Sequence, residues 1–132
     1  MDFDDVNGVM VPRYTRTSQF IKIRDGVRSI PERFYEDYDQ LTCIQIPNSV
    51  KHIGDYAFKG FSSLTIVYMP EYLSTIGVWC FYECTKLTML HIPDSVHDIK
   101  EEVFKRCETL CAVILPSQLQ SITDRCFSNA GS

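Results

Sequence analysis

The sequence predicts a β-solenoid, in which similar coils of chain stack on one another and share one core. The first observation is that four consecutive blocks of 23 residues align without a gap, starting at Leu41, Leu64, Leu87 and Leu110. The second is that the same positions of each block are apolar. A constant period in the twenties is typical of solenoids, whose units bury their apolar faces only by stacking.

The repeat register divides the chain into two parts. A fifth and degraded unit begins at Ser18 and lacks the opening Leu and the Pro of the others. We therefore predict an N-terminal cap over residues 1–17, where a β-prone stretch ends at Pro12, followed by one domain over residues 18–132. The five repeats of this domain are 18–40, 41–63, 64–86, 87–109 and 110–132.

The opening of each repeat predicts one short parallel strand per coil. Positions one, four and six follow the pattern L-x-x-L-x-L, whose last three positions alternate as in a strand with one buried face. The fourth and sixth positions of the third repeat, for example, are Val67 and Met69. The seventh position is proline in four repeats, and proline ends the strand because it has no backbone donor for the ladder.

The second half of each repeat predicts the return path of the coil. Position 13 is isoleucine in every repeat and is expected to be buried. After it, apolar residues recur at a spacing of three to four, as in Phe58 and Phe61. This spacing favours a short helical or 3₁₀ turn on the outer side of the coil.

These residues identify a family. The run from Ile46 to Phe61, IPNSVKHIGDYAFKGF, resembles the core motif I-P-x-S-V-x-x-I-G-x-x-A-F-x-x-C of BspA-like leucine-rich repeat proteins. The resemblance covers residues 18–132. It implies a right-handed coil stack that binds other macromolecules, as in surface proteins of host-associated bacteria and in large families of parasitic protozoa. It implies no catalytic residues and no cofactor.

Composition and charge limit the partners. The chain has 13 Lys and Arg against 17 Asp and Glu, a formal net charge of −4, and its cations are scattered. A nucleic-acid partner is therefore not expected, because that role requires a basic face. Membrane insertion is not expected either, since no run of 18 apolar residues occurs, and the acidic start MDFDDVNGVM is unlike a secretory signal. An intracellular location and a place within a longer surface protein both stay open.

The third and fifth positions of each strand are predicted to point to solvent, yet several of them are apolar. These residues are expected to form a contiguous surface that contacts a protein partner. The alternative is that β-propensity alone selects them and that neighbouring loops cover them. The predicted contact residues are Ile66, Tyr68, Met89, His91 and Ile114.

A second candidate surface lies on the outer turns. Tyr56 and Trp79 occupy the same position of successive repeats, and Tyr72 and Tyr82 belong to the same repeat as Trp79. Aromatic side chains are common anchors of interfaces. Large aromatic groups also serve simply to cover the gaps between coils, and we favour that interpretation here.

The six cysteines are interpreted mainly as core residues. Cys84 and Cys107 share a position that is Phe61 in one repeat, which indicates packing. A disulfide between Cys84 and Cys107 is an alternative, because stacking brings equivalent positions close together. The C-x₃-C spacings do not match a structural zinc site, so no metal is expected.

The sequence therefore predicts a non-enzymatic module that binds a protein through its strand face. One alternative is a self-assembling module that forms a homodimer through an uncapped C-terminal coil or through the apolar face of the sheet. A remote alternative is a Cys/His hydrolase that uses Cys43 or Cys111 with His91 and Asp94.

Overall fold

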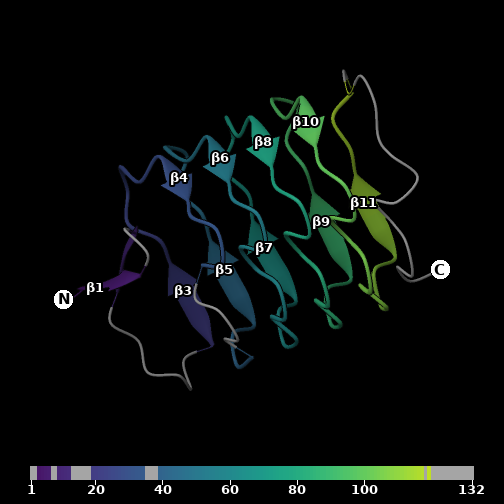
Figure 1. Ribbon diagram of the computed structural model, residues 1–132, viewed down its shortest axis with the longest axis horizontal. Helices are drawn as coiled ribbons and strands as arrows, with labels where there is room; N and C mark the ends of the chain where they lie inside the picture. The colour runs from purple at the N-terminus through teal and green to yellow at the C-terminus, as the bar shows by residue number, and fades with distance from the viewer. Residues whose placement is uncertain (1–2, 7–8, 13–18, 35–38, 118, 120–132) are drawn as a thin grey trace.

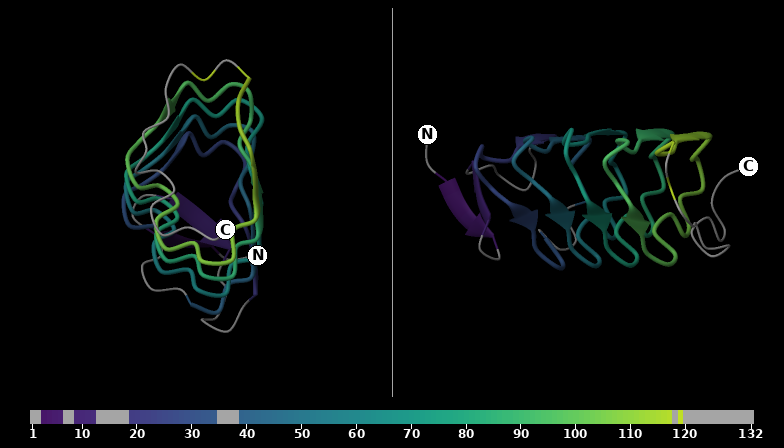
Figure 2. Two further views of the ribbon diagram at one scale, coloured as in Figure 1. Left: turned by 90° about the vertical axis from the view of Figure 1, so that its right-hand side faces the viewer. Right: turned by 90° about the horizontal axis from the view of Figure 1, so that it is seen from above.

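The structure is a computed structural model that describes residues 3–6, 9–12, 19–34, 39–117 and 119. The chain winds into successive coils, and equivalent segments of the coils lie in parallel rows (Figures 1 and 2). The β-solenoid predicted from the repeats is thus confirmed. We number the coils 1 to 5 after the five repeats that begin at residues 18, 41, 64, 87 and 110.

The predicted strand is present at the start of every coil. These strands lie in one row along the stack, which we call the first sheet side. They are β3 (Phe20–Lys22), β5 (Cys43–Gln45), β7 (Ile66–Tyr68), β9 (Met89–His91) and β11 (Ala112–Ile114). β3, β5 and β7 form one parallel sheet, and β9 pairs with β11 in another. Each residue pairs with the residue 23 positions later, so that the repeat register is also the ladder register.

Each of the first four coils also contains a second strand, which the sequence did not predict. These two-residue strands form one parallel sheet, the second sheet (Figure 1). They are β4 (Ser29–Ile30), β6 (His52–Ile53), β8 (Thr75–Ile76) and β10 (Asp98–Ile99). A strand of two residues is too short to show an alternating pattern, so only its isoleucine was visible in the sequence.

The outer segments are turns, and the described residues contain no helix or 3₁₀-helix in place of the predicted one. Alternate amides bond to the next coil, as from Phe58 N to Cys80 O at 2.9 Å and from Phe81 N to Val103 O at 3.0 Å, while amides between them close single turns, as from Lys59 N to Tyr56 O at 3.2 Å. A helix would need these amides for its own carbonyls. Tyr56, at φ 59°, also interrupts any helical run, as do its equivalents in the other described coils.

The core runs along the stack between the two sheets and the outer turns. Ile30, Ile53, Ile76 and Ile99 are at most 4% exposed, as the unbroken isoleucine column predicted. Phenylalanine rings form a second column, in which Phe81 and Phe104 stack with centroids 5.9 Å apart. No polar or charged residue is buried in the described part of the chain. Burial of apolar area therefore supplies most of the stabilisation.

Two glycines allow the coils to approach closely after the second sheet. A Cβ atom on Gly54 would lie 2.6 Å from the backbone nitrogen of Glu32, and one on Gly77 would lie 2.6 Å from that of Asp55. Real Cβ atoms essentially never come so near to backbone atoms. Position 14 of these coils therefore requires glycine for packing.

The N-terminal segment forms a hairpin at the first end of the stack (Figure 2). β1 (Phe3–Val6) pairs antiparallel with β2 (Val9–Pro12), and β2 lies next to β3. This is where the predicted cap would lie, and its shielding role stays a prediction. The C-terminal coil of the self-assembly hypothesis spans residues 110–132, and its uncapped end after Phe127 lies outside the described residues.

Candidate interaction surface

The strands of the first sheet side carry a surface whose side chains alternate between core and solvent. In β9, Leu90 is 1% exposed, whereas Met89 on one side of it is 59% exposed and His91 on the other is also exposed. In β7, Val67 packs against the core, and Ile66 and Tyr68 point outward. The strand geometry thus places alternate residues on the outer face of the sheet, as expected.

All five residues predicted to form the contact surface are exposed, and they lie on three neighbouring coils. We call Ile66, Tyr68, Met89, His91 and Ile114 the contact patch. Ile114 is in register with His91, and β9 lies beside β7. Tyr68 is 55% exposed and Ile114 52% exposed, so neighbouring loops do not cover them. Exposed apolar groups that adjoin in this way usually mark a contact site.

The edge of the contact patch is acidic. The eighth position of each coil follows the strand by three residues, and in coils 3 and 4 it is occupied by the exposed Glu71 and Asp94. Among the outward positions of the described strands at the start of the coils, the positively charged residue is Lys22 on β3. The surface therefore combines an apolar centre with carboxylates along one side.

Three of the four outer aromatic candidates come together in a cluster. The rings of Trp79 and Tyr82 stack with centroids 4.7 Å apart, and Tyr56 meets Trp79 edge to face at 5.5 Å. The Lys59 ammonium lies 5.6 to 5.9 Å from all three ring centroids. All three aromatic residues are half-buried, and their faces are occupied by one another and by cations. This arrangement favours the interpretation that they cover the gap between coils.

Tyr72, the fourth aromatic candidate, belongs to a different region. It follows β7 on the turn after the strand and is 54% exposed. Its described ring contact is with Lys51, whose Nζ lies 4.9 Å from the ring centroid. Tyr72 is thus an exposed aromatic residue outside both the cluster and the contact patch.

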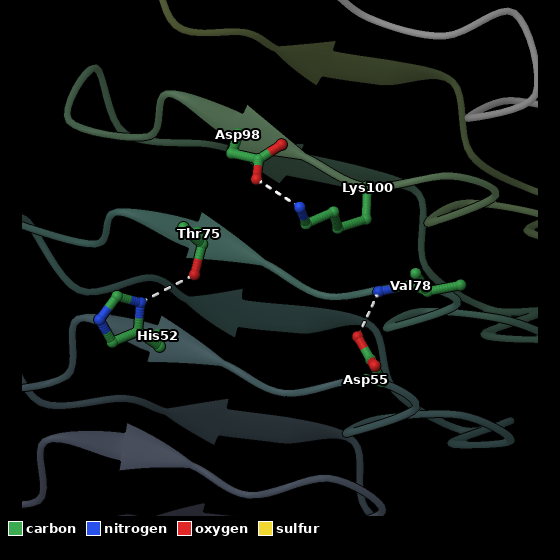
Figure 3. Close-up of polar contacts among 6 residues, drawn as sticks. All are labelled: His52, Asp55, Thr75, Val78, Asp98 and Lys100. Atoms are coloured by element: carbon green, nitrogen blue, oxygen red, sulfur yellow. Dashed lines mark hydrogen bonds and ion pairs between the residues drawn. The ribbon is translucent and has the colours of Figure 1, made fainter.

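The second sheet carries a row of polar contacts that the sequence reasoning missed (Figure 3). The His52 Nδ1 and Thr75 Oγ1 atoms are 2.8 Å apart, and the Lys100 ammonium lies 2.7 Å from an Asp98 carboxylate oxygen. The hydrogen bond from Lys100 to Asp98 and the charge of that carboxylate raise the pKa of Lys100. His52, Thr75 and Lys100 line a groove together with Asp55. Their types differ between repeats, so no sequence pattern pointed to them.

The buried cysteines behave as packing residues. Cys84 and Cys107 are fully buried free thiols, and their Sγ atoms donate to the carbonyl oxygens of Phe58 at 3.3 Å and Phe81 at 3.0 Å. Burial raises the pKa of Cys84 well above its usual value and that of Cys107 to about 12. Both thiols are therefore neutral near pH 7, and the disulfide between them stays a prediction.

Cys43, one nucleophile of the remote hydrolase hypothesis, is not adjacent to His91. Cys43 is on β5 and His91 on β9, with β7 between them. Burial raises the pKa of Cys43, which disfavours the thiolate that a nucleophile needs. Among the described residues no three His, Cys, Asp or Glu side chains form a group able to hold a metal ion. In the same part of the chain, no helix has the length and apolar character needed to cross a membrane.

Comparison with protein families decides the relationship. The family described as BspA type Leucine rich repeat region matches residues 14–132 in six copies. The chain belongs to this family. The match begins just before the first repeat of our register and covers all five coils of this BspA-type repeat region. No curated protein shows significant sequence similarity to the chain.

Solved structures of bacterial leucine-rich repeat proteins share the fold. A leucine-rich cell surface protein from Faecalibacterium prausnitzii superposes with a TM-score of 0.85 at 24% identity, over 97% of this chain and 37% of that one. A leucine-rich repeat protein from Bacteroides capillosus gives 0.68 at 23% identity, over 86% and 98% of the two chains. The BspA-type region thus spans a little more than a third of the Faecalibacterium chain.

Proposed function

We propose that the protein is a non-enzymatic binding module that contacts another protein through its contact patch. The observation that carries this proposal is the exposure of four apolar or aromatic residues on adjacent strands, each 46 to 59% exposed: Ile66, Tyr68, Met89 and Ile114. Family membership agrees with it, because such repeats commonly serve in protein binding or adhesion.

The chemistry of the surface indicates the partner. Tyr68 and Met89 offer an aromatic and a flexible apolar contact, which suit aliphatic or aromatic side chains. Glu71 and Asp94 at the edge of the contact patch would attract a basic residue beside that apolar group. We therefore expect a protein segment with an apolar centre and a basic flank.

A rigid stack favours such binding. The backbone of the strands is already held by inter-coil ladders in the free protein. Association then orders few groups of the module itself, and less free energy is lost on binding. Specificity comes from the variable residues at the outward strand positions.

The test uses a displayed peptide library selected on the folded protein. Enriched peptides should bind in a fluorescence-anisotropy titration, and Tyr68→Ser combined with Met89→Ser should raise the Kd about tenfold or more. Tyr72→Ser is the matched control, because Tyr72 is as exposed as Tyr68 but lies outside the contact patch. Equal binding to the double variant, or a loss on Tyr72→Ser alone, would place the binding surface elsewhere.

A further inference from the structure

The ladder of the first sheet side is interrupted between coils 3 and 4. β7 and β9 lie side by side, yet they belong to separate sheets (Figure 1). At the sixth position of the coil, Ile46 N donates to Tyr68 O at 3.0 Å and Ile92 N to Ile114 O at 2.9 Å. The equivalent bond between coils 3 and 4 would run from Met69 N to His91 O. It is absent, although residues 64–92 are all described.

The second and third positions show the same interruption. Thr65 N and Ile66 N both donate to Thr42 O, at 2.8 and 3.2 Å. One junction further on, the equivalent bonds from Thr88 N and Met89 N to Thr65 O are missing among these described residues. Backbone amides at the second, third and sixth positions thus lose their inter-coil partner at this junction alone among the described junctions.

The same junction is looser around the rest of the coil. Most inter-coil hydrogen bonds between coils 3 and 4 are longer by 0.3 to 0.4 Å than the equivalent bonds between coils 2 and 3, whereas Phe81 N to Val103 O at 3.0 Å is only 0.1 Å longer than Phe58 N to Cys80 O. Three pairs show the difference. His97 N to Ser74 O is 3.1 Å against 2.8 Å for Ser74 N to Lys51 O, and Lys100 N to Ile76 O is 3.2 Å against 2.9 Å for Gly77 N to Ile53 O. Trp79 N to Glu101 O is 3.3 Å against 2.9 Å for Tyr56 N to Val78 O.

Two side-chain acceptors that join other coils have no counterpart between coils 3 and 4, although Arg106 Nη1 to Glu83 Oε1 at 3.4 Å and Ser95 Oγ to Glu71 O at 3.1 Å do cross this junction. Asn48 Oδ1 accepts from Glu71 N at 2.9 Å, and Asp94 Oδ1 accepts from Ser117 N at 3.1 Å. Glu71, at the same position of coil 3, has one more methylene and makes no such bond in the described residues. Asp55 Oδ1 accepts from Val78 N at 2.8 Å (Figure 3), whereas the apolar Val78 offers no acceptor to coil 4.

Lys100 adds a steric reason. Positions 54 and 77 are glycine, because a Cβ atom there would lie 2.6 Å from the backbone of the preceding coil. Lys100 occupies the equivalent position of coil 4 and carries a Cβ atom. Coils 3 and 4 must therefore separate slightly at this point, which agrees with the longer bond from Lys100 N to Ile76 O.

We propose that the junction between coils 3 and 4 is a flexible joint of the solenoid, produced by Glu71, Val78 and Lys100. It lies beneath the contact patch, since Ile66 and Tyr68 belong to one side of it and the other members of the patch to the other. If the proposed function holds, a partner that contacts both coils tightens the joint on binding. The joint itself does not depend on that function.

Amide hydrogen exchange of the free protein, followed residue by residue by NMR, tests the joint. The amides of Met69 and Met89 should exchange about tenfold or more faster than those of Ile46 and Ile66, their bonded equivalents between coils 2 and 3. Equal protection of the two pairs would overturn the proposal. Because no partner is present, this result is independent of the peptide-binding test.

A repaired variant tests the cause. Glu71→Asn with Lys100→Gly should supply the short acceptor and remove the Cβ atom, and should slow exchange at Met69 and Met89 about tenfold. The matched control is Glu71→Gln with Lys100→Ala, which makes the same charge changes but keeps a long acceptor and a Cβ atom. Equal exchange in the two double variants would refute the roles given to Glu71 and Lys100.

Discussion

Truncation of Ile76 to alanine measures whether the isoleucine column holds the stack together. Ile76 is fully buried in β8, in register with Ile53 on β6 on one side and followed by Ile99 on β10 on the other. The substitution removes three carbon atoms, which costs about 2.4 kcal/mol at about 0.8 kcal/mol for each buried methylene. The paired strands on both sides limit collapse around the vacated space, so a cavity term adds to this loss. We expect a total of about 3 to 4 kcal/mol.

The assay is equilibrium urea unfolding followed by far-UV circular dichroism. Ile66→Ala is the matched control, because Ile66 is 46% exposed on the strand face, and we expect it to cost less than about 1 kcal/mol. The m-value should stay the same in both variants, which indicates that cooperativity of the stack is unchanged. A loss below about 1 kcal/mol for Ile76→Ala, or equal losses for the two variants, would refute the assignment of core and surface positions.

Three further outcomes are expected. Gly77→Ala should lower the free energy of unfolding by about 1 to 3 kcal/mol in the same assay, because its Cβ would overlap the backbone of the preceding coil; a neutral result would contradict the close packing. Iodoacetamide should label the exposed Cys111 in the folded protein and Cys107 only after unfolding, as peptide mass mapping would show; rapid labelling of Cys107 would contradict its burial. Tyr68→Ser with Met89→Ser should leave the unfolding midpoint within a few degrees of wild type, since both side chains are exposed; a large loss would place them in the core.

The sequence predicted the strand positions well because a strand with one buried face has a strong signature. Positions three to five of the coil alternate, and the alternation told Leu90 from its exposed neighbours Met89 and His91. The isoleucine column was equally clear, since one residue type recurs at a fixed position. Where equivalent positions of the repeats are chosen only for burial, the repetition of apolar residues along the chain reveals that they are buried.

The outer turns were harder to predict because their burial pattern imitates a helix. Ala57, Phe58 and Phe61 are all buried, which matches the spacing of a short helical face. What distinguishes the turns is where their amides bond, and Gly60 N, for example, donates to Tyr82 O of the next coil at 2.8 Å. A bond between residues so far apart in the chain leaves no local signal in the sequence.

The loose junction also escaped the sequence analysis, for a different reason. Glu71, Val78 and Lys100 each look like ordinary variation at a position of the repeat that is not buried. Their effect depends on which side chain faces them across the coil boundary, so it became visible only when equivalent hydrogen bonds were compared. A residue that departs from the repeat consensus should therefore be read together with the residue that faces it on the neighbouring coil.

The register of the ladders restricts how such a chain can change in length. Every described strand pair of the solenoid joins residues 23 apart. Deleting one residue within coil 3 would shift part of that coil against both neighbours and turn core side chains toward solvent. Duplicating or deleting a whole coil would instead leave every remaining pair in register. Length variation among relatives of this chain should therefore occur in whole coils, with single-residue insertions confined to the turns.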